Sequence, residues 1–121
     1  MERRYDLEER LIDFACLIIE LIEHLPEGKA ANHIGGQLLR SGTAPALNYG
    51  EAQSAESIQD FIHKNRVVLK ELRESQVNLK IMTKRKMFNT MPELGNKALD
   101  EARQLVAIFT KTIDTARKNK T

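Results

Sequence analysis

SAESIQDFIHKNRVVLKELRESQVNLKIMTKRK, residues 54–86, is the stretch of sequence that decides the fold. Its apolar side chains recur every three or four residues, a spacing that places them on one side of an α-helix. Charged side chains occupy the positions between them. We therefore predict a long amphipathic helix over about residues 54–86. The apolar stripe consists of Ile58, Phe61, Ile62, Val68, Leu69, Leu72, Leu79 and Met82.

The segment of about residues 6–25 has the same pattern. Leucine, isoleucine and phenylalanine fall three or four residues apart, while acidic side chains take the opposite side. Pro26 and Gly28 follow, and these residues end a helix and supply a short connection. A second amphipathic helix is therefore expected here.

A third amphipathic segment covers about residues 91–117. Thr90 fits the N-cap, Pro92 the first helical turn and Glu93 the third position of a Thr-x-x-Glu capping pattern. Leucine, alanine, valine and phenylalanine then repeat at helical spacing. This helix should therefore start directly after Thr90.

The remaining helical segment, about residues 30–52, is irregular because many of its side chains are small. Pro45 cannot donate a backbone hydrogen bond to Ser41, and a proline inside a helix costs about 3 kcal/mol unless packing offsets it. We therefore predict a kink near Pro45. The small residues should also let a neighbouring helix approach closely.

Four amphipathic segments with short links bury their stripes most simply in one antiparallel up-and-down four-helix bundle. The fold class is thus all-α, with a single domain over residues 1–121. No apolar run approaches the roughly 20 residues that cross a bilayer, so we expect no membrane association and a cytoplasmic protein. The one cysteine, Cys16, is expected to be a buried apolar residue.

No catalytic, cofactor or metal chemistry is written in the sequence. His24, His33 and His63 are never spaced four residues apart, as a metal site on a single helix requires. The glycines form no dinucleotide or phosphate loop. Adjacent carboxylates fall on solvent-facing positions, where they serve solubility. We therefore predict that the protein is not an enzyme and has no cofactor.

Charge is distributed unevenly along the chain. Residues 1–53 carry a net charge of −4 and residues 54–121 a net charge of +6. Basic side chains gather at the ends of the last two predicted helices, where they would either complement the helix macrodipole or contact phosphate. The candidate nucleic-acid-binding residues are Lys84, Arg85, Lys86, Arg117, Lys118 and Lys120.

A set of polar residues interrupts positions that the apolar pattern places inward. Buried charges persist when they are paired and hydrogen-bonded. We therefore predict a structural polar network that fixes how the helices align, with Arg40 meeting Glu71. Its members are Gln37, Arg40, Asn48, Glu51 and Glu71.

Several short motifs occur in a characteristic order. They are Gln37-Leu38-Leu39-Arg40-Ser41, Asn48-Tyr49-Gly50-Glu51-Ala52, Phe61-Ile62 and Lys70-Glu71-Leu72. In this order the chain resembles, over about residues 10–115, the bacterial four helix bundle proteins related to those encoded in intervening sequences of 23S ribosomal RNA genes. It departs from that pattern at Val67-Val68, where members carry a Gly-Ser pair.

The resemblance implies an up-and-down bundle that assembles into a homopentamer. The chain is also distantly similar to the accessory proteins of diversity-generating retroelements, which bind nucleic acid and a reverse transcriptase. The resulting hypothesis is a non-enzymatic, homo-oligomeric helical protein that acts as a nucleic-acid-associated or adaptor protein, with RNA or DNA as its partner. The alternative is a structural module that binds a protein partner and no nucleic acid.

Overall fold

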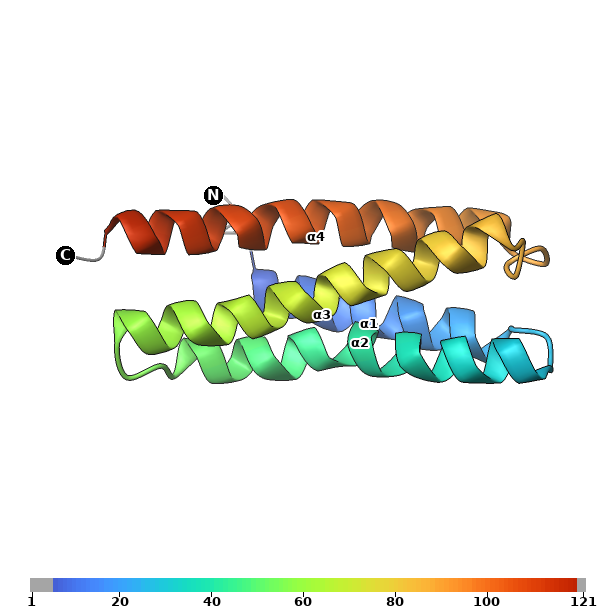
Figure 1. Ribbon diagram of the computed structural model, residues 1–121, viewed down its shortest axis with the longest axis horizontal. Coiled ribbons are helices and arrows are strands. Elements are labelled where there is room, and N and C mark those ends of the chain that lie inside the picture. Colours follow the sequence, from blue (N-terminus) through green and yellow to red (C-terminus); the bar gives the residue numbers. More distant parts are fainter. Residues whose placement is uncertain (1–5, 120–121) are drawn as a thin grey trace.

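A computed structural model describes residues 6–119, and Figure 1 shows the four helices that they form. Each helix runs antiparallel to the next, and contacts join α1 to α2, α2 to α3, α3 to α4 and α4 back to α1. The predicted all-α, up-and-down four-helix bundle is therefore confirmed. The helices are α1 (Leu7–Glu23), α2 (Lys29–Gln53), α3 (Ile58–Lys84) and α4 (Pro92–Lys118).

Helix α1 has 17 residues, against 25 in α2 and 27 in each of α3 and α4. Its N-cap is Asp6, whose carboxylate accepts a hydrogen bond from the backbone N–H of Glu9 at 3.2 Å. At 1.5 Å per residue α1 is about 12–15 Å shorter than its neighbours. It therefore stops short of the end where α2 joins α3 (Figure 1).

Helix α3 begins at Ile58 and not at Ser54 as the sequence suggested. The reason is a reciprocal cap: Ser57 Oγ accepts from the N–H of Asp60 at 3.0 Å, and the Asp60 carboxylate accepts from the N–H of Glu56 at 3.2 Å. That second bond also holds the pKa of Asp60 below its ordinary value. Helix α2 continues to Gln53, so the link between α2 and α3 consists of residues 54–57 and ends at this cap.

The α3–α4 connection also differs from the prediction. Lys86 lies outside α3, with a left-handed φ of 58°, and helix α4 is capped by Met91, which makes no side-chain cap hydrogen bond. Thr90 is therefore one residue too early to cap α4, and the Thr-x-x-Glu pattern is wrong. The side chain of Phe88 fills this end of the bundle against Gly95, where an added Cβ would lie 2.5 Å from the ring.

The core is a continuous set of buried apolar side chains from all four helices. Tyr49 packs edge-on against Phe109, with ring centroids 5.5 Å apart. Burial of such side chains contributes about 1.5–3 kcal/mol each. The largest fully buried apolar members are Phe14, Phe109, Leu11, Ile18, Leu21, Leu38, Leu72, Leu79, Met82, Leu105 and Val68.

The small residues of α2 do bring helices close together. A Cβ at Gly42 would lie 2.8 Å from Cγ1 of Ile18 on α1, and one at Gly35 would lie 3.0 Å from Leu25. Helix α2 continues through the buried Pro45 without ending. The kink expected near Pro45 stays a prediction. Cys16, expected to be buried, is exposed on α1.

Candidate polyanion-binding groove

The predicted contact between Arg40 and Glu71 is present, but it lies at the surface. Arg40 donates to Glu71 and to Glu74, each at 3.0 Å, and its own side chain is 60% exposed. The expectation of a buried network is therefore wrong. The two carboxylates share the guanidinium because they lie on the side of α3 that faces α2.

The other members of the predicted network are not part of this contact. The Gln37 amide lies 3.3 Å from the His33 ring, one turn away on α2. Asn48 is half-buried and Glu51 is exposed, and in the described part of the chain neither hydrogen-bonds to Arg40 or Glu71. Gln37 nevertheless lies on the side of α2 that faces α3, since it lines the same surface hollow as Asn78 of α3.

Two polar contacts between helices were missed by the sequence reasoning. Ser75 of α3 donates to Ser41 of α2 at 2.9 Å, and both hydroxyls are fully buried. Arg10 of α1 donates to Glu101 of α4 at 2.6 Å and also to Gln104. Both contacts join neighbouring helices, the first in the core and the second nearer the surface.

A row of exposed cations follows the outer side of α3. Its members fall at successive steps of four and three residues, and Val77 takes the fourth place. The row spans 19 residues, and its two ends lie about 27 Å apart. Helical spacing in the sequence would have revealed it, because the same periodicity defined the apolar stripe. This α3 row consists of Arg66, Lys70, Arg73, Lys80 and Lys84.

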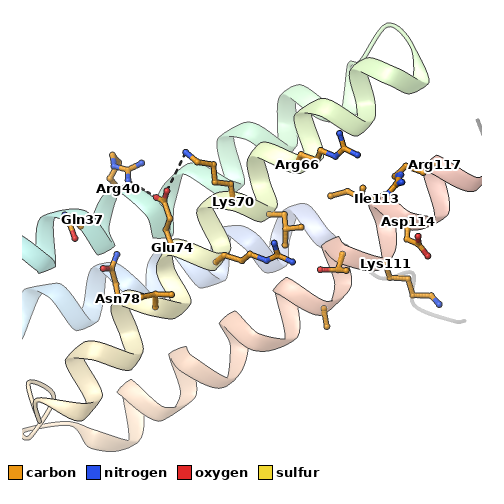
Figure 2. Close-up of a pocket in the computed structure, with 15 residues that line it drawn as sticks. Gln37, Arg40, Arg66, Lys70, Glu74, Asn78, Lys111, Ile113, Asp114 and Arg117 are labelled. Carbon is orange, nitrogen blue, oxygen red and sulfur yellow. Dashed lines mark hydrogen bonds and ion pairs between the residues drawn. The ribbon is translucent and has the colours of Figure 1, made fainter.

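The first part of the α3 row borders an open groove of about 1270 Å³ between α3 and α4 (Figure 2). Lys111 and Arg117 line it from α4, and Arg40 reaches its rim from α2. Six cationic side chains line this groove, against two carboxylates, those of Glu74 and Asp114. The groove therefore presents a surplus of positive charge.

Both carboxylates are already neutralised by neighbouring cations. Glu74 pairs with Arg40 at 3.0 Å and with Lys70 at 3.6 Å, and Asp114 pairs with Lys118 at 3.3 Å. The Arg40 hydrogen bond holds the pKa of Glu74 below its ordinary value. Cations that make no ion pair with another described residue are left to face solvent: Arg66, Arg73, Lys111 and Arg117.

The two predicted basic clusters lie at opposite ends of the bundle, because α3 and α4 are antiparallel (Figure 1). Lys84, Arg85 and Lys86 are exposed at one end, and Arg117 and Lys118 at the other. Lys120 lies outside the described residues. Of the five described residues, only Arg117 lines the groove, and three of its other cations, Arg66, Lys70 and Arg73, belong to the α3 row.

The charged groups of the groove are mainly cations, and apolar side chains such as Leu69, Val77 and Ile113 lie between them. Its lining includes no aromatic side chain and no histidine or cysteine. Within residues 6–119, no three His, Cys, Asp or Glu side chains gather to hold a metal ion. None of the helices in that range is long and apolar enough to cross a membrane. A ligand of this site would be held by its negative charge.

Comparison with known proteins supports the fold. The chain is similar to the crystal structure of a protein of unknown function from the S23 ribosomal protein family of Bacteroides thetaiotaomicron, with a TM-score of 0.77 and 24% sequence identity. The match covers 89% of this chain and 98% of the other. No family model matches the chain, and no curated protein does. The resemblance inferred from the motifs is thus supported at the level of the fold.

Proposed function

We propose that this protein is a non-enzymatic, homo-oligomeric helical bundle that binds the phosphate backbone of RNA or DNA through the α3–α4 groove. The observation that carries the proposal is the α3 row, in which Arg66 and Arg73 face solvent and make no ion pair with another described residue. Arginine can bind phosphate through two parallel hydrogen bonds. A straight row of such groups on a rigid helix suits a regularly charged polymer.

The same surface argues for binding without sequence preference. Single-strand binding proteins stack bases on aromatic side chains, and the groove lining has none. Phosphate contacts position a protein on nucleic acid but carry no sequence information. The affinity of this groove would therefore come from charge, and duplex and single-stranded forms would differ mainly in charge density.

The homo-oligomeric part of the proposal rests on the family resemblance, which favours a homopentamer. Light scattering of the purified chain tests it directly, and a monomer at all concentrations would contradict it. The second candidate function is a module that binds a protein partner. It is favoured by exposed apolar side chains on α1, Ile12 and Ile19, which are each 40% exposed.

Filter binding with ribosomal RNA and with duplex DNA over a salt series tests the nucleic-acid proposal. The logarithm of the affinity should fall linearly with the logarithm of salt concentration. The double variant Arg66→Gln/Arg73→Gln should bind more weakly and reduce the magnitude of that slope by about two, one for each lost phosphate contact.

The matched control is Lys29→Gln/Lys97→Gln, which removes the same charge at exposed positions outside the groove. It should leave the slope near that of the wild type. The triple variant Lys84→Gln/Arg85→Gln/Lys86→Gln measures the contribution of the α3 end separately. Absence of retention at low salt would overturn the proposal, and a pull-down partner insensitive to nuclease would then favour the second candidate.

A further inference from the structure

The outward side of α1 is acidic along its whole length. Its carboxylates, Glu9, Asp13, Glu20 and Glu23, follow one another at intervals of four, seven and three residues. The exposed Cys16 lies on the same side, between Asp13 and Glu20. The only basic residue of the helix, Arg10, pairs with α4. The exposed apolar side chains of Ile12 and Ile19 lie along the same side. This α1 face comprises Glu9, Ile12, Asp13, Cys16, Ile19, Glu20 and Glu23.

The outward side of α3 has the same layout with the opposite charge. Its cations, the α3 row, also follow four- and three-residue steps, and its central place is taken by Val77. Val77 is 54% exposed and Ile81, beside it, is 44% exposed. On both helices, charged side chains therefore lie on either side of a less polar residue, Cys16 on α1 and Val77 on α3. A surface of this kind has an apolar middle to exclude water and a charged rim to select its partner.

These two faces cannot meet within one molecule. Helices α1 and α3 make no contact with each other, because each lies between α2 and α4. The acidic and basic faces thus point to opposite sides of the bundle. In an up-and-down bundle α1 and α3 run in the same direction, so two bundles standing side by side and parallel bring α1 of one beside α3 of the other.

We propose that the α1 face docks on the α3 row of a second copy of this chain. Because the two surfaces differ, the contact is head to tail, and it closes into a ring or grows into a filament depending on its rotation angle. The contact covers the same cations that would hold a polyanion. Each α3 row is therefore open either to another copy or to a polyanion, so the oligomer of the proposed function binds nucleic acid only at copies whose α3 row no neighbour covers; this consequence rests on the proposed function.

Complementation between two neutralised variants tests the head-to-tail contact. Asp13→Asn/Glu20→Gln weakens only the α1 face, and Arg73→Gln/Lys80→Gln weakens only the α3 row. In sedimentation velocity each variant alone should associate about tenfold more weakly than the wild type, which corresponds to a loss of about 1.4 kcal/mol of charge pairing. An equimolar mixture should form a one-to-one complex that does not grow, because each copy keeps one intact face.

The control Glu27→Gln/Glu93→Gln removes two exposed carboxylates away from the α1 face and should assemble like the wild type. Circular dichroism verifies that each variant is folded. A wild type that stays monomeric at all concentrations would overturn the inference. So would variants that assemble as well as the wild type, or a mixture that behaves as two separate monomers.

Disulfide trapping locates the contact independently of charge. The chain has a single cysteine, so Val77→Cys provides a second thiol at the centre of the α3 row. Mild oxidation should link Cys16 of one copy to position 77 of another, as identified by peptide mass spectrometry, and extend beyond dimers. Leu47→Cys, on α2 and 73% exposed, is the control and should give no such link. Equal trapping at both positions would contradict the proposed contact.

Adding RNA to the assembled protein separates this inference from the proposed function. Dissociation of the assembly as RNA binds supports both. If the α1 variants assemble normally while the groove variants lose RNA binding, the interface is wrong and the function stands. If the complementation succeeds but no RNA binds at low salt, the interface stands and the nucleic-acid proposal fails.

Discussion

Three consecutive residues of α2 face three different surroundings, and they show two ways of holding helices together. Arg40 reaches out to carboxylates on α3 and stays largely in solvent. Ser41 is fully buried against Ser75, and Gly42 is buried against Ile18 on α1. The charged side chain of Arg40 lies where water screens its ion pairs, whereas the small residues Ser41 and Gly42 lie where the packing leaves no room for an extra atom.

The difference teaches which of the two contacts determines stability. An exposed ion pair contributes little, because solvent screens the charges and two long side chains must be ordered. A close-packed site responds to a single added methyl group, because the surrounding side chains have nowhere to move. The alignment of α2 with its neighbours should therefore depend on residues 41 and 42 more than on Arg40.

The largest effect is expected from Gly42→Ala. The new Cβ would lie 2.8 Å from Cγ1 and 2.9 Å from Cγ2 of Ile18, a stiff, fully buried side chain. Overpacking of this kind lowers the free energy of unfolding by about 1–3 kcal/mol. Urea denaturation measures the change.

Gly36→Ala is the matched control, because nothing lies within 4 Å of its added Cβ. Alanine is favoured over glycine inside a helix, so this variant should be more stable than the wild type by about 0.5–1 kcal/mol. Equal effects at the two glycines would show that helix propensity, and not space, governs α2.

A loss of similar size is expected from Ser41→Ala. Ser75 would lose the acceptor that lies 2.9 Å away, and an unpaired buried hydroxyl costs about 1–3 kcal/mol. The double variant Ser41→Ala/Ser75→Ala removes both partners and should recover part of that loss. A double-mutant cycle by thermal unfolding measures the coupling, and strictly additive losses would contradict a shared hydrogen bond.

Arg40→Gln should change the melting temperature less than Gly42→Ala or Ser41→Ala does, because the Arg40 side chain is 60% exposed. The difference from the wild type should shrink further in concentrated salt, which screens the Glu71 and Glu74 pairs. A loss as large as that of Gly42→Ala that persists in high salt would show that the ion pairs of Arg40 stabilise the fold as much as the close packing at Gly42 does.

The smallest effect is the acid dependence of the same contact. The Arg40 hydrogen bond lowers the pKa of Glu74 in the folded protein. The contact therefore stabilises the fold fully above the ordinary pKa of glutamate, and this stabilisation is lost as the pH falls through the lowered pKa of Glu74 in the folded state. Stability curves of the wild type and Arg40→Gln should therefore converge in acid. An NMR titration should show a higher pKa for Glu74 in the variant, and an unchanged value would argue against the hydrogen bond.

Helical periodicity was enough to predict the fold. The stripes of residues 54–86 and 91–117 identify α3 and α4, and four such stripes allow few other architectures. The helix ends were harder to predict, since several residues near each end can cap. Ser57 caps α3 because the carboxylate of Asp60, three residues later, completes the reciprocal cap. The residue three positions after Ser54 is Ser57, which has no carboxylate to complete such a cap.

The candidate site was only partly predictable. Charge in consecutive runs pointed to Lys84, Arg85 and Lys86, whereas the α3 row is spread over 19 residues and becomes continuous only on a helix. The partner of Arg40 was foreseen, but its exposure was not, because exposure depends on how α2 is turned against α3. The Ser41–Ser75 contact depends on the crossing point of two helices, which no local pattern specifies.

The shortness of α1 gives the bundle a weak end. Past the start of α1, α4 runs on beside α3 (Figure 1). There the described residues leave open a shallow apolar hollow around Phe61, Ile108 and Ala116. Ile58, at the start of α3, is 47% exposed at the same end. With fewer buried contacts, this end should open locally long before the whole molecule unfolds. Amide hydrogens should therefore exchange fastest in the last turns of α4 and progressively more slowly toward Phe88, where the opposite end of the bundle is sealed.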